Sequence, residues 1–211
     1  KMEIKIRNVT KKIKDAIVLD CINMELKSGT VYGLQGKNGS GKTMLLRLLC
    51  GFILPSEGEV EINGKVLGKE LSFPENTGVL IENPAFLDYF TGYDNLKILA
   101  EIRNKMTEKE IEEILEKVGL DPNDKRKYRK YSLGMKQRLG IACAFMEKPD
   151  LILLDEPTNA LDPEGIECLH RLVEEAKERK ALIILACHDA EELNQMADVV
   201  IQMDRGRVMG G

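Results

Sequence analysis

One short segment constrains the fold of this 211-residue chain more than any other. A compact apolar run at residues 31–34 leads into Gly36-x4-Gly41-Lys42-Thr43, and a helical pattern follows over 44–50. A strand, a glycine-rich loop and a helix in this order bring backbone N–H groups to a helix N-terminus, where they bind phosphate. The segment therefore predicts a Walker A phosphate loop, and a plain glycine turn is the weaker alternative. The predicted phosphate-binding residues are Gly36, Lys37, Asn38, Gly39, Ser40, Gly41, Lys42 and Thr43.

A second motif follows much later in the chain. The apolar run 151–154 ends in Asp155 and Glu156, which is the form of a Walker B strand. A carboxylate at the end of a buried strand can hold Mg²⁺ together with the Thr43 hydroxyl, and the next carboxylate can orient or deprotonate water. Many strands end in acidic turns, so this motif is weak by itself. The phosphate loop makes it strong.

Strand and helix patterns alternate on both sides of one helical block. Apolar strands that alternate with helices predict a parallel sheet covered by helices, an α/β fold. Asn63-Gly64 predicts a hairpin turn, and Thr107 with Glu110 predicts a capping box. The predicted strands are 2–9, 22–26, 31–34, 59–62, 77–81, 151–155, 182–186 and 199–203, and the predicted helices are 44–50, 95–103, 108–118, 133–146, 163–179 and 190–196.

Composition excludes several classes of protein. The formal net charge of −4 argues against a dedicated nucleic-acid binder, and the absence of Trp argues against stacking platforms for bases. The five cysteines are scattered without a CxxC pair, so reduced thiols are expected and not a zinc site or disulfides. The longest apolar stretches are far shorter than a membrane span of ~20 residues. The N-terminal residues alternate as in a strand, unlike a signal peptide.

The stretch Tyr131-Ser132-Leu133-Gly134-Met135-Lys136-Gln137-Arg138 precedes the acidic strand. Here the chain resembles the nucleotide-binding ATPase subunits of ABC transporters, whose signature motif is typically Leu-Ser-Gly-Gly-Gln. Ser132 and Gly134 match that motif, and three neighbouring positions depart from it. Ser132 is also an ordinary helix N-cap, and both readings can hold together.

Three further positions fit the same family. Asp162 lies in the segment 158–163, which is similar to the family's D-loop, although Asp followed by Pro163 is also an ordinary helix start. His188 follows a predicted strand, as the family's switch histidine does, although a lone histidine there is usually structural. Glu82 stands where most members have glutamine, which resembles the bacitracin-resistance and lantibiotic-immunity group.

This resemblance implies a P-loop NTPase (RecA-like) core with a parallel sheet, an antiparallel β subdomain and an inserted α-helical subdomain. It implies one ABC ATPase domain over 1–211, with the core and β subdomain at 1–83 and 147–211 and the helical part at about 84–146. The implied cofactors are ATP and Mg²⁺. The implied site residues are Glu156, His188 and Lys42 for catalysis, Ser132, Gly134 and Asp162 for further nucleotide contacts, and Thr43, Asp155 and Glu82 for the metal.

The resemblance also implies partners. Two copies would close on ATP as a homodimer and power an integral-membrane permease, with no nucleic acid involved. Such a chain is cytoplasmic and attached to the inner face of the cell membrane through the permease. Export of an antimicrobial peptide or drug is the implied role, and an ABC-type ATPase that acts on ribosomes or DNA without a permease is the alternative. A regulatory module without turnover is disfavoured by Glu156.

Three surfaces leave alternatives open. The family stacks adenine on an aromatic residue, but residues 9–18 contain none, so Ile13 or Val18 is expected to contact the base. The basic run 125–130 is a solvated loop or a contact for an acidic partner or lipid headgroup. Aromatic residues near the start of the helical block either receive a permease helix or fill the block's own core; they are Phe86, Tyr89, Phe90 and Tyr93.

Overall fold

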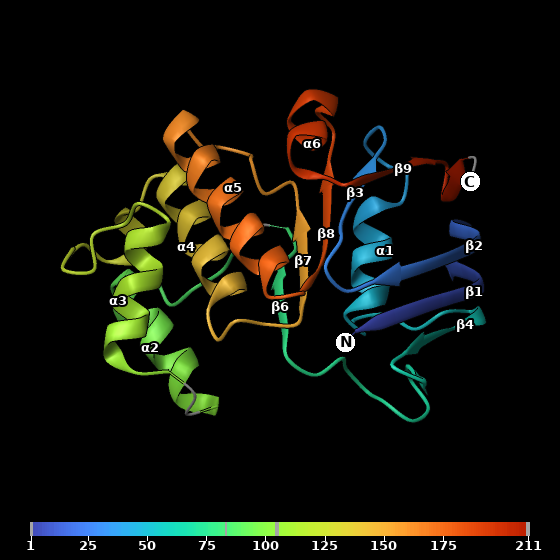
Figure 1. The fold of residues 1–211 in the computed structure, drawn as a ribbon, viewed down its shortest axis with the longest axis horizontal. Coiled ribbons are helices and arrows are strands. Elements are labelled where there is room, and N and C mark those ends of the chain that lie inside the picture. The colour runs from blue at the N-terminus through green and yellow to red at the C-terminus, as the bar shows by residue number, and fades with distance from the viewer. Residues whose placement is uncertain (1, 83, 104–105, 210–211) are drawn as a thin grey trace.

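The computed structural model describes residues 2–82, 84–103 and 106–209. Within them, six strands form a sheet in the order β10-β9-β3-β8-β7-β6, in which every neighbouring pair except β9–β10 is parallel. Helix α1 lies on one side of this sheet, and α4 and α5 lie on the other (Figure 1). The strands are β3 (Val31–Gln35), β6 (Thr77–Leu80), β7 (Leu151–Asp155), β8 (Leu182–Cys187), β9 (Val199–Asp204) and β10 (Arg207–Met209).

Side chains of the central strands alternate between two hydrophobic cores. In β7, Leu151 and Leu153 join the core that contains α1, whereas Ile152 and Leu154 join the core that contains α4 and α5. Strands that are buried on both faces read as continuous apolar runs, so β7 and β8 were predicted close to their observed bounds. The helices that cover the sheet are α1 (Lys42–Leu49), α4 (Leu133–Phe145), α5 (Pro163–Glu178) and α6 (Ala190–Met196).

A second, antiparallel sheet packs on α1. In the described part of the chain its order is β2-β1-β4-β5. Ile62 pairs with Lys65, which confirms the predicted hairpin turn at Asn63-Gly64. The two-residue strand β5 was not predicted, because so short a run carries no readable period. The strands are β1 (Glu3–Ile13), β2 (Ala16–Lys27), β4 (Glu57–Ile62) and β5 (Lys65–Val66).

The strands β1 and β2 form one long hairpin, so the predicted strands at 2–9 and 22–26 are too short. Register shifts interrupt their pairing, and Asn8 and Cys21 have positive φ angles of 49° and 51°. Each bulge displaces the alternation of inward and outward side chains. A period-two pattern therefore breaks in the middle of a continuous strand, and the sequence shows only its two ends.

The helical block lies at one end of the molecule (Figure 1). Thr107 and Glu110 form the predicted capping box at the start of α3. Leu139 of α4 shares one core with Leu80 and Ile152 of the sheet, so the block and the sheet are packed together. The division of the chain near 83/84 and 146/147 stays a prediction, and Asn83 lies outside the described residues. The elements are α2 (Gly92–Arg103), α3 (Glu108–Lys117), a short 3₁₀ helix (Tyr128–Lys130) and α4.

The parallel arrangement positions the site. Strands β3, β7 and β8 are neighbours and run in the same direction, so their carboxyl ends meet at one edge of the sheet. Loops that follow the carboxyl ends of such strands bind ligands. Across 2–82, 84–103 and 106–209, no helix is both long and apolar enough to pass through a membrane.

Candidate functional site

The phosphate loop (residues 36–43) connects β3 to α1. Gly41, the N-cap of α1, has φ of 105° and supplies no side-chain cap, which leaves N–H groups at the helix start open to an anion. A Cβ on Gly36 would lie 2.4 Å from the Met203 carbonyl oxygen, so no larger residue fits there. The buried hydroxyl of Ser40 has no hydrogen-bond partner among the described residues. These unused donors fit a phosphate ligand.

Lys42 lies inside the loop and is only 6% exposed. Its Nζ donates to the Gly36 carbonyl at 2.6 Å and more weakly to the Lys37 carbonyl at 3.4 Å. The Glu156 carboxylate is 3.9 Å away. The ammonium group is therefore held over the loop, at the point where phosphate oxygens would be bound.

Thr43 and Asp155 meet across the edge of the sheet. The Thr43 hydroxyl donates to Asp155 Oδ2 at 2.7 Å, although the two residues are far apart in sequence. Burial raises the pKa of Asp155, and the negative charges of Glu156 and Glu82 raise it further. A buried carboxylate and a hydroxyl are hard oxygen ligands, so this pair fits a Mg²⁺ ion.

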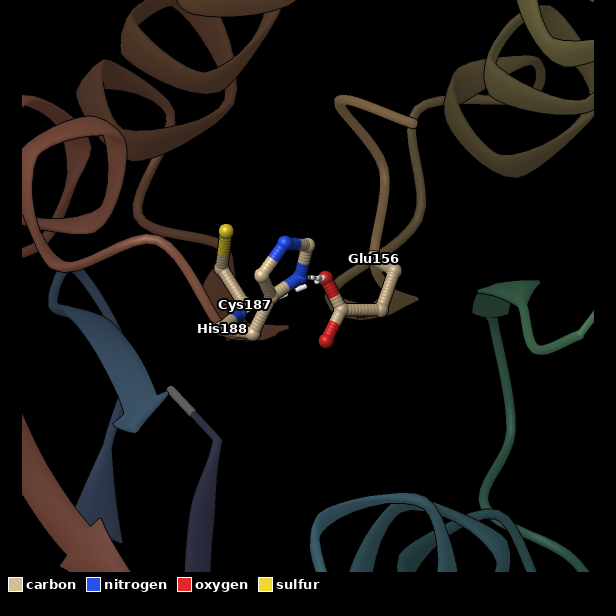
Figure 2. A group of neighbouring side chains, drawn as sticks. All are labelled: Glu156, Cys187 and His188. Atoms are coloured by element: carbon tan, nitrogen blue, oxygen red, sulfur yellow. Dashed lines mark hydrogen bonds and ion pairs between the residues drawn. The ribbon is translucent and has the colours of Figure 1, made fainter. Parts of the chain in front are cut away.

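Glu156 and His188 form a direct pair at the ends of β7 and β8 (Figure 2). His188 Nδ1 and Glu156 Oε2 are 2.7 Å apart, and the His188 backbone N–H donates to the same oxygen at 3.3 Å. Glu156 has a left-handed backbone with φ of 46°, and its N–H donates to the Ala186 carbonyl at 2.8 Å. This bend turns the carboxylate toward His188 and Lys42 and away from the strand direction.

Cys187 lies beside this pair, and the three side chains have the ligand types of a transition-metal site. Their ligand atoms lie within 4.8 Å of one another, but the dashed bonds in Figure 2 join only Glu156 and His188. Burial raises the pKa of the Cys187 thiol, and the Glu156 carboxylate adds to this effect. A protonated thiol is a weak metal ligand, and Glu156 and His188 already bond to each other. The geometry therefore fits an acid–base pair better than a zinc site.

Glu82, the third predicted metal ligand, has a different partner. Its carboxylate forms an ion pair with the Arg47 guanidinium of α1, and its side chain is 61% exposed. It is close enough to contribute to the raised pKa of Asp155, as the last of the causes. Glu82 therefore adds negative charge near Asp155, but its ion pair with Arg47 holds it at the edge of the site.

A cleft of about 780 Å³ opens beside the phosphate loop. Asp155 and Glu156 line it, as do Ile13 and Val18, the two expected base contacts. Other lining residues were not predicted, namely Ala16, Ile17, Arg205 and Gly206.

The signature segment (residues 131–138) lies outside this cleft. Neither Ser132 nor Gly134 is among the described residues that line it. Ser132 caps α4 by accepting from the Met135 N–H at 3.2 Å, which confirms the N-cap prediction. A Cβ on Gly134 would lie 2.8 Å from the Ala160 carbonyl oxygen, so the helix start is packed closely on the D-loop.

Two residues of the signature segment have contacts that the sequence did not predict. Arg138 is buried, and it donates to the Asp162 carboxylate at 2.5 Å and to the Val118 carbonyl at 2.8 Å. Gln137 Nε2 donates to the Glu156 carbonyl at 3.3 Å and to the Pro157 carbonyl at 3.0 Å. Asp162 is the predicted N-cap of α5. The segment is therefore bonded to the turn that follows the acidic strand.

The aromatic residues near residue 90 divide between two environments. Phe86 and Tyr93 pack against the hydrophobic core, whereas Tyr89 and Phe90 are 70% and 41% exposed. A cleft of about 530 Å³ next to Phe86 and Leu87 has a mainly apolar lining.

Two cations of the basic run 125–130 have partners within the chain. Arg126 pairs with Asp124, and the Arg129 guanidinium lies over the Tyr89 ring.

Comparison with known proteins places this geometry in one family. The ABC transporter family profile matches residues 19–159. The chain is 46% identical over 205 residues to YybJ, an uncharacterized ABC transporter ATP-binding protein of Bacillus subtilis, covering 97% of this chain and 94% of YybJ. It is 40% identical to the bacitracin transport ATP-binding protein BcrA of Bacillus licheniformis, covering 98% and 68% of the two chains.

Two further matches agree. The lantibiotic transport ATP-binding protein SrtF of Streptococcus pyogenes is 34% identical, with 98% of this chain and 89% of SrtF covered. The dimeric structure of MJ0796, a bacterial ABC transporter cassette, superposes with a TM-score of 0.86 at 25% identity, covering 98% and 97% of the two chains. With its phosphate loop, acidic strand and paired glutamate and histidine, the chain is an ATP-binding, ATP-hydrolysing member of the ABC transporter family, similar to bacitracin and lantibiotic transport ATPases.

Proposed function

We propose that this ATPase drives a membrane permease which removes an antimicrobial peptide or a drug, and that it works as a homodimer on the cytoplasmic face of the membrane. The observation that carries the proposal is the separation of two half-sites on one chain. The phosphate loop and carboxylates line a cleft, whereas Ser132 and Gly134 lie outside it. A second copy would bring its signature segment to the first copy's ATP.

The catalytic roles follow from the contacts. Lys42, held over the phosphate loop, offsets negative charge on the β- and γ-phosphates. Glu156 accepts a proton from the attacking water, and His188, bonded to that carboxylate, orients it and contacts the γ-phosphate. Ser132 and the N-terminal amides of α4 in the partner would contact the same phosphate, and Asp162 would hold that helix through Arg138.

Mg²⁺ would bind at Thr43 and Asp155 and would neutralise charge between the β- and γ-phosphates. These two residues already lie within hydrogen-bond distance, so little rearrangement is needed. Glu82 can join them only by leaving Arg47. The relatives named for bacitracin transport and lantibiotic transport support the transport of such a compound.

We assign the permease contact to the apolar cleft beside Phe86 and Leu87. Leu87 is 50% exposed although it is a large apolar residue, and Tyr89 and Phe90 next to it are exposed as well. An apolar cleft with exposed apolar neighbours suits an amphipathic helix from a membrane protein.

Two measurements test the proposal. Glu156→Gln protein should form a dimer in ATP and Mg²⁺, measured by light scattering, while the wild type dimerises only transiently. Tagged wild-type chain should also copurify with a multi-helix membrane protein from native membranes, and Leu87→Glu should lose that partner without losing ATPase activity. If Leu87→Glu keeps the membrane protein, the proposed contact at Leu87 is wrong. If the active ATPase associates only with ribosomes or DNA, the permease role is wrong.

A further inference from the structure

The nucleotide cleft continues beyond the phosphate loop into a region with one aliphatic wall. This wall comes from the turn between β1 and β2, where Ile13 pairs with Ala16 and Lys12 pairs with Ile17. Ile13 and Ile17 are 41% and 52% exposed, and both line the cleft. Large aliphatic side chains left open beside a phosphate site offer a surface for an apolar or aromatic part of the ligand.

Another part of the lining comes from the turn between β9 and β10. Asp204 pairs with Arg207, so Arg205 and Gly206 form a two-residue turn with φ angles of 46° and 79°. The Gly206 N–H donates to the Ser40 carbonyl at 2.9 Å, and the Gly206 carbonyl accepts from the Asp20 N–H at 2.8 Å. This turn is therefore bonded to the phosphate loop on one side and to β2 on the other.

Close packing holds the turn in place. A Cβ on Gly206 would lie 2.8 Å from the Val18 carbonyl oxygen, so glycine is required at that position. The neighbouring Arg207 pairs with Asp20 at 2.6 Å. Arg205 consequently projects from a turn whose backbone is tied to the nucleotide site at several points.

Arg205 is the cationic residue of the cleft lining whose N–H groups have no partner among the described residues. Lys42, the other cation that lines the cleft, donates to the phosphate loop. Within residues 2–82, 84–103 and 106–209, the Arg205 guanidinium makes no hydrogen bond or ion pair, although it lines the same cleft as Ile13 and Ile17. A planar guanidinium stacks on aromatic faces, and every nucleobase has such a face.

We propose that the nucleotide base is bound between the Arg205 guanidinium and the aliphatic wall of Ile13 and Ile17, in place of an aromatic side chain. The proposal rests on nucleotide binding at the phosphate loop and not on the permease. The aliphatic wall has no polar group, and a guanidinium stacked on the base directs its N–H groups parallel to the ring and away from the base edge, so ATP and GTP bind about equally. Pyrimidine nucleotides bind more weakly because their single ring has a smaller face.

Calorimetric titrations of the full chain test this. The Glu156→Gln background prevents turnover, and the ligands are the Mg²⁺ complexes of ATP, GTP, CTP and inorganic tripolyphosphate. Arg205→Ala should weaken ATP and GTP about fivefold, the effect of losing one partly exposed cation–π contact, and should leave tripolyphosphate unchanged. Arg171→Ala is the matched control, because it removes an exposed arginine of α5 that does not line the cleft.

Three outcomes would overturn the proposal. Equal weakening of ATP and tripolyphosphate would mean that Arg205 binds phosphate. An unchanged ATP affinity in folded Arg205→Ala protein, checked by thermal melting, would remove Arg205 from the site. A tenfold preference of wild type for ATP over GTP would show that the base edge is recognised. Loss of the permease partner would leave all these affinities unchanged, so the two proposals fail independently.

Discussion

The phosphate side and the signature side of this ATPase use their polar residues differently. On the phosphate side, the side chains proposed to act on ATP bond to one another: Thr43 to Asp155, and Glu156 to His188. On the signature side, Ser132 caps its own helix, and Arg138 binds Asp162. The first side is arranged for a ligand within its own cleft, and the second is arranged to hold a helix end at a fixed position.

This difference has a physical basis. Lys42 and Asp155 are buried and the Glu156 side chain is only 20% exposed, so each needs a partner within the chain while no Mg²⁺ or ATP is bound. A helix N-terminus already carries partial positive charge on its amides, so the signature side needs only a rigid support. We therefore expect substitutions on the phosphate side to change rates, and substitutions on the signature side to change stability unless they add charge.

Glu156→Gln should have the largest effect. The amide keeps an oxygen that can accept from the His188 N–H, but it cannot accept a proton from water. We expect kcat to fall by about a hundredfold or more, with ATP affinity and melting temperature retained. Steady-state ATPase assays and calorimetry measure this. Glu192→Gln is the matched control near Cys187, and a turnover equal to wild type in Glu156→Gln would disprove the assigned role.

Ser132→Asp separates the helix-capping role of Ser132 from its proposed contact with the γ-phosphate. Aspartate is as good an N-cap as serine, so α4 should remain stable. Its charge would face the γ-phosphate in the proposed dimer, and like charges about 4 Å apart cost several kcal/mol near a protein surface. ATP hydrolysis should therefore fall at least about tenfold without a change in melting temperature. Thr107→Asp, a similar change at the cap of α3, should leave the rate unaltered. A Ser132→Asp protein with full activity would contradict the proposed contact between Ser132 and the ATP of the second copy.

Arg138→Met should lower stability. Methionine fills similar space but leaves the Val118 carbonyl without its donor, and an unsatisfied buried acceptor costs about 1–3 kcal/mol. Urea titration measures the free energy of unfolding. Arg126→Met is the surface control, because Arg126 pairs with Asp124 and is 59% exposed. A stability equal to wild type in Arg138→Met would mean that the D-loop is held by other contacts.

Arg47→Ala should have the smallest effect. The Arg47–Glu82 pair is partly exposed, and such pairs contribute less than about 1 kcal/mol. Urea titration should show only a slight loss of unfolding free energy, similar to that of Lys97→Ala, which removes another surface pair. A loss above about 2 kcal/mol would show that the Glu82 segment depends on Arg47 for its structure.

Local patterns predicted much of the fold and the site. The runs 151–154 and 182–187 are apolar throughout because both faces of the sheet are covered, and their short length favours strands over helices. The phosphate loop is recognisable because its glycines, lysine and threonine are adjacent in sequence. The long β1–β2 hairpin was underestimated, because its bulges interrupt the alternation on which a strand prediction depends.

Contacts between distant segments were not predictable. Arg138 stands in a helical pattern, where arginine is ordinarily solvated, and only packing of α4 against the end of α3 buries it. Arg205 and Ile13 lie near opposite ends of the sequence, and no local pattern connects them, although both line the cleft. The Arg47–Glu82 pair likewise joins α1 to a loop after β6.

The sequence by itself determined the α/β class, the phosphate loop, the acidic strand and the family resemblance, because each depends on residues that are neighbours in the chain. Only the tertiary structure decided which distant side chains share the cleft, which carboxylate pairs with His188 or Arg47, and that Ser132 lies outside the cleft of its own chain. Those contacts depend on strand order and helix packing, and neither is encoded in a local pattern of residues.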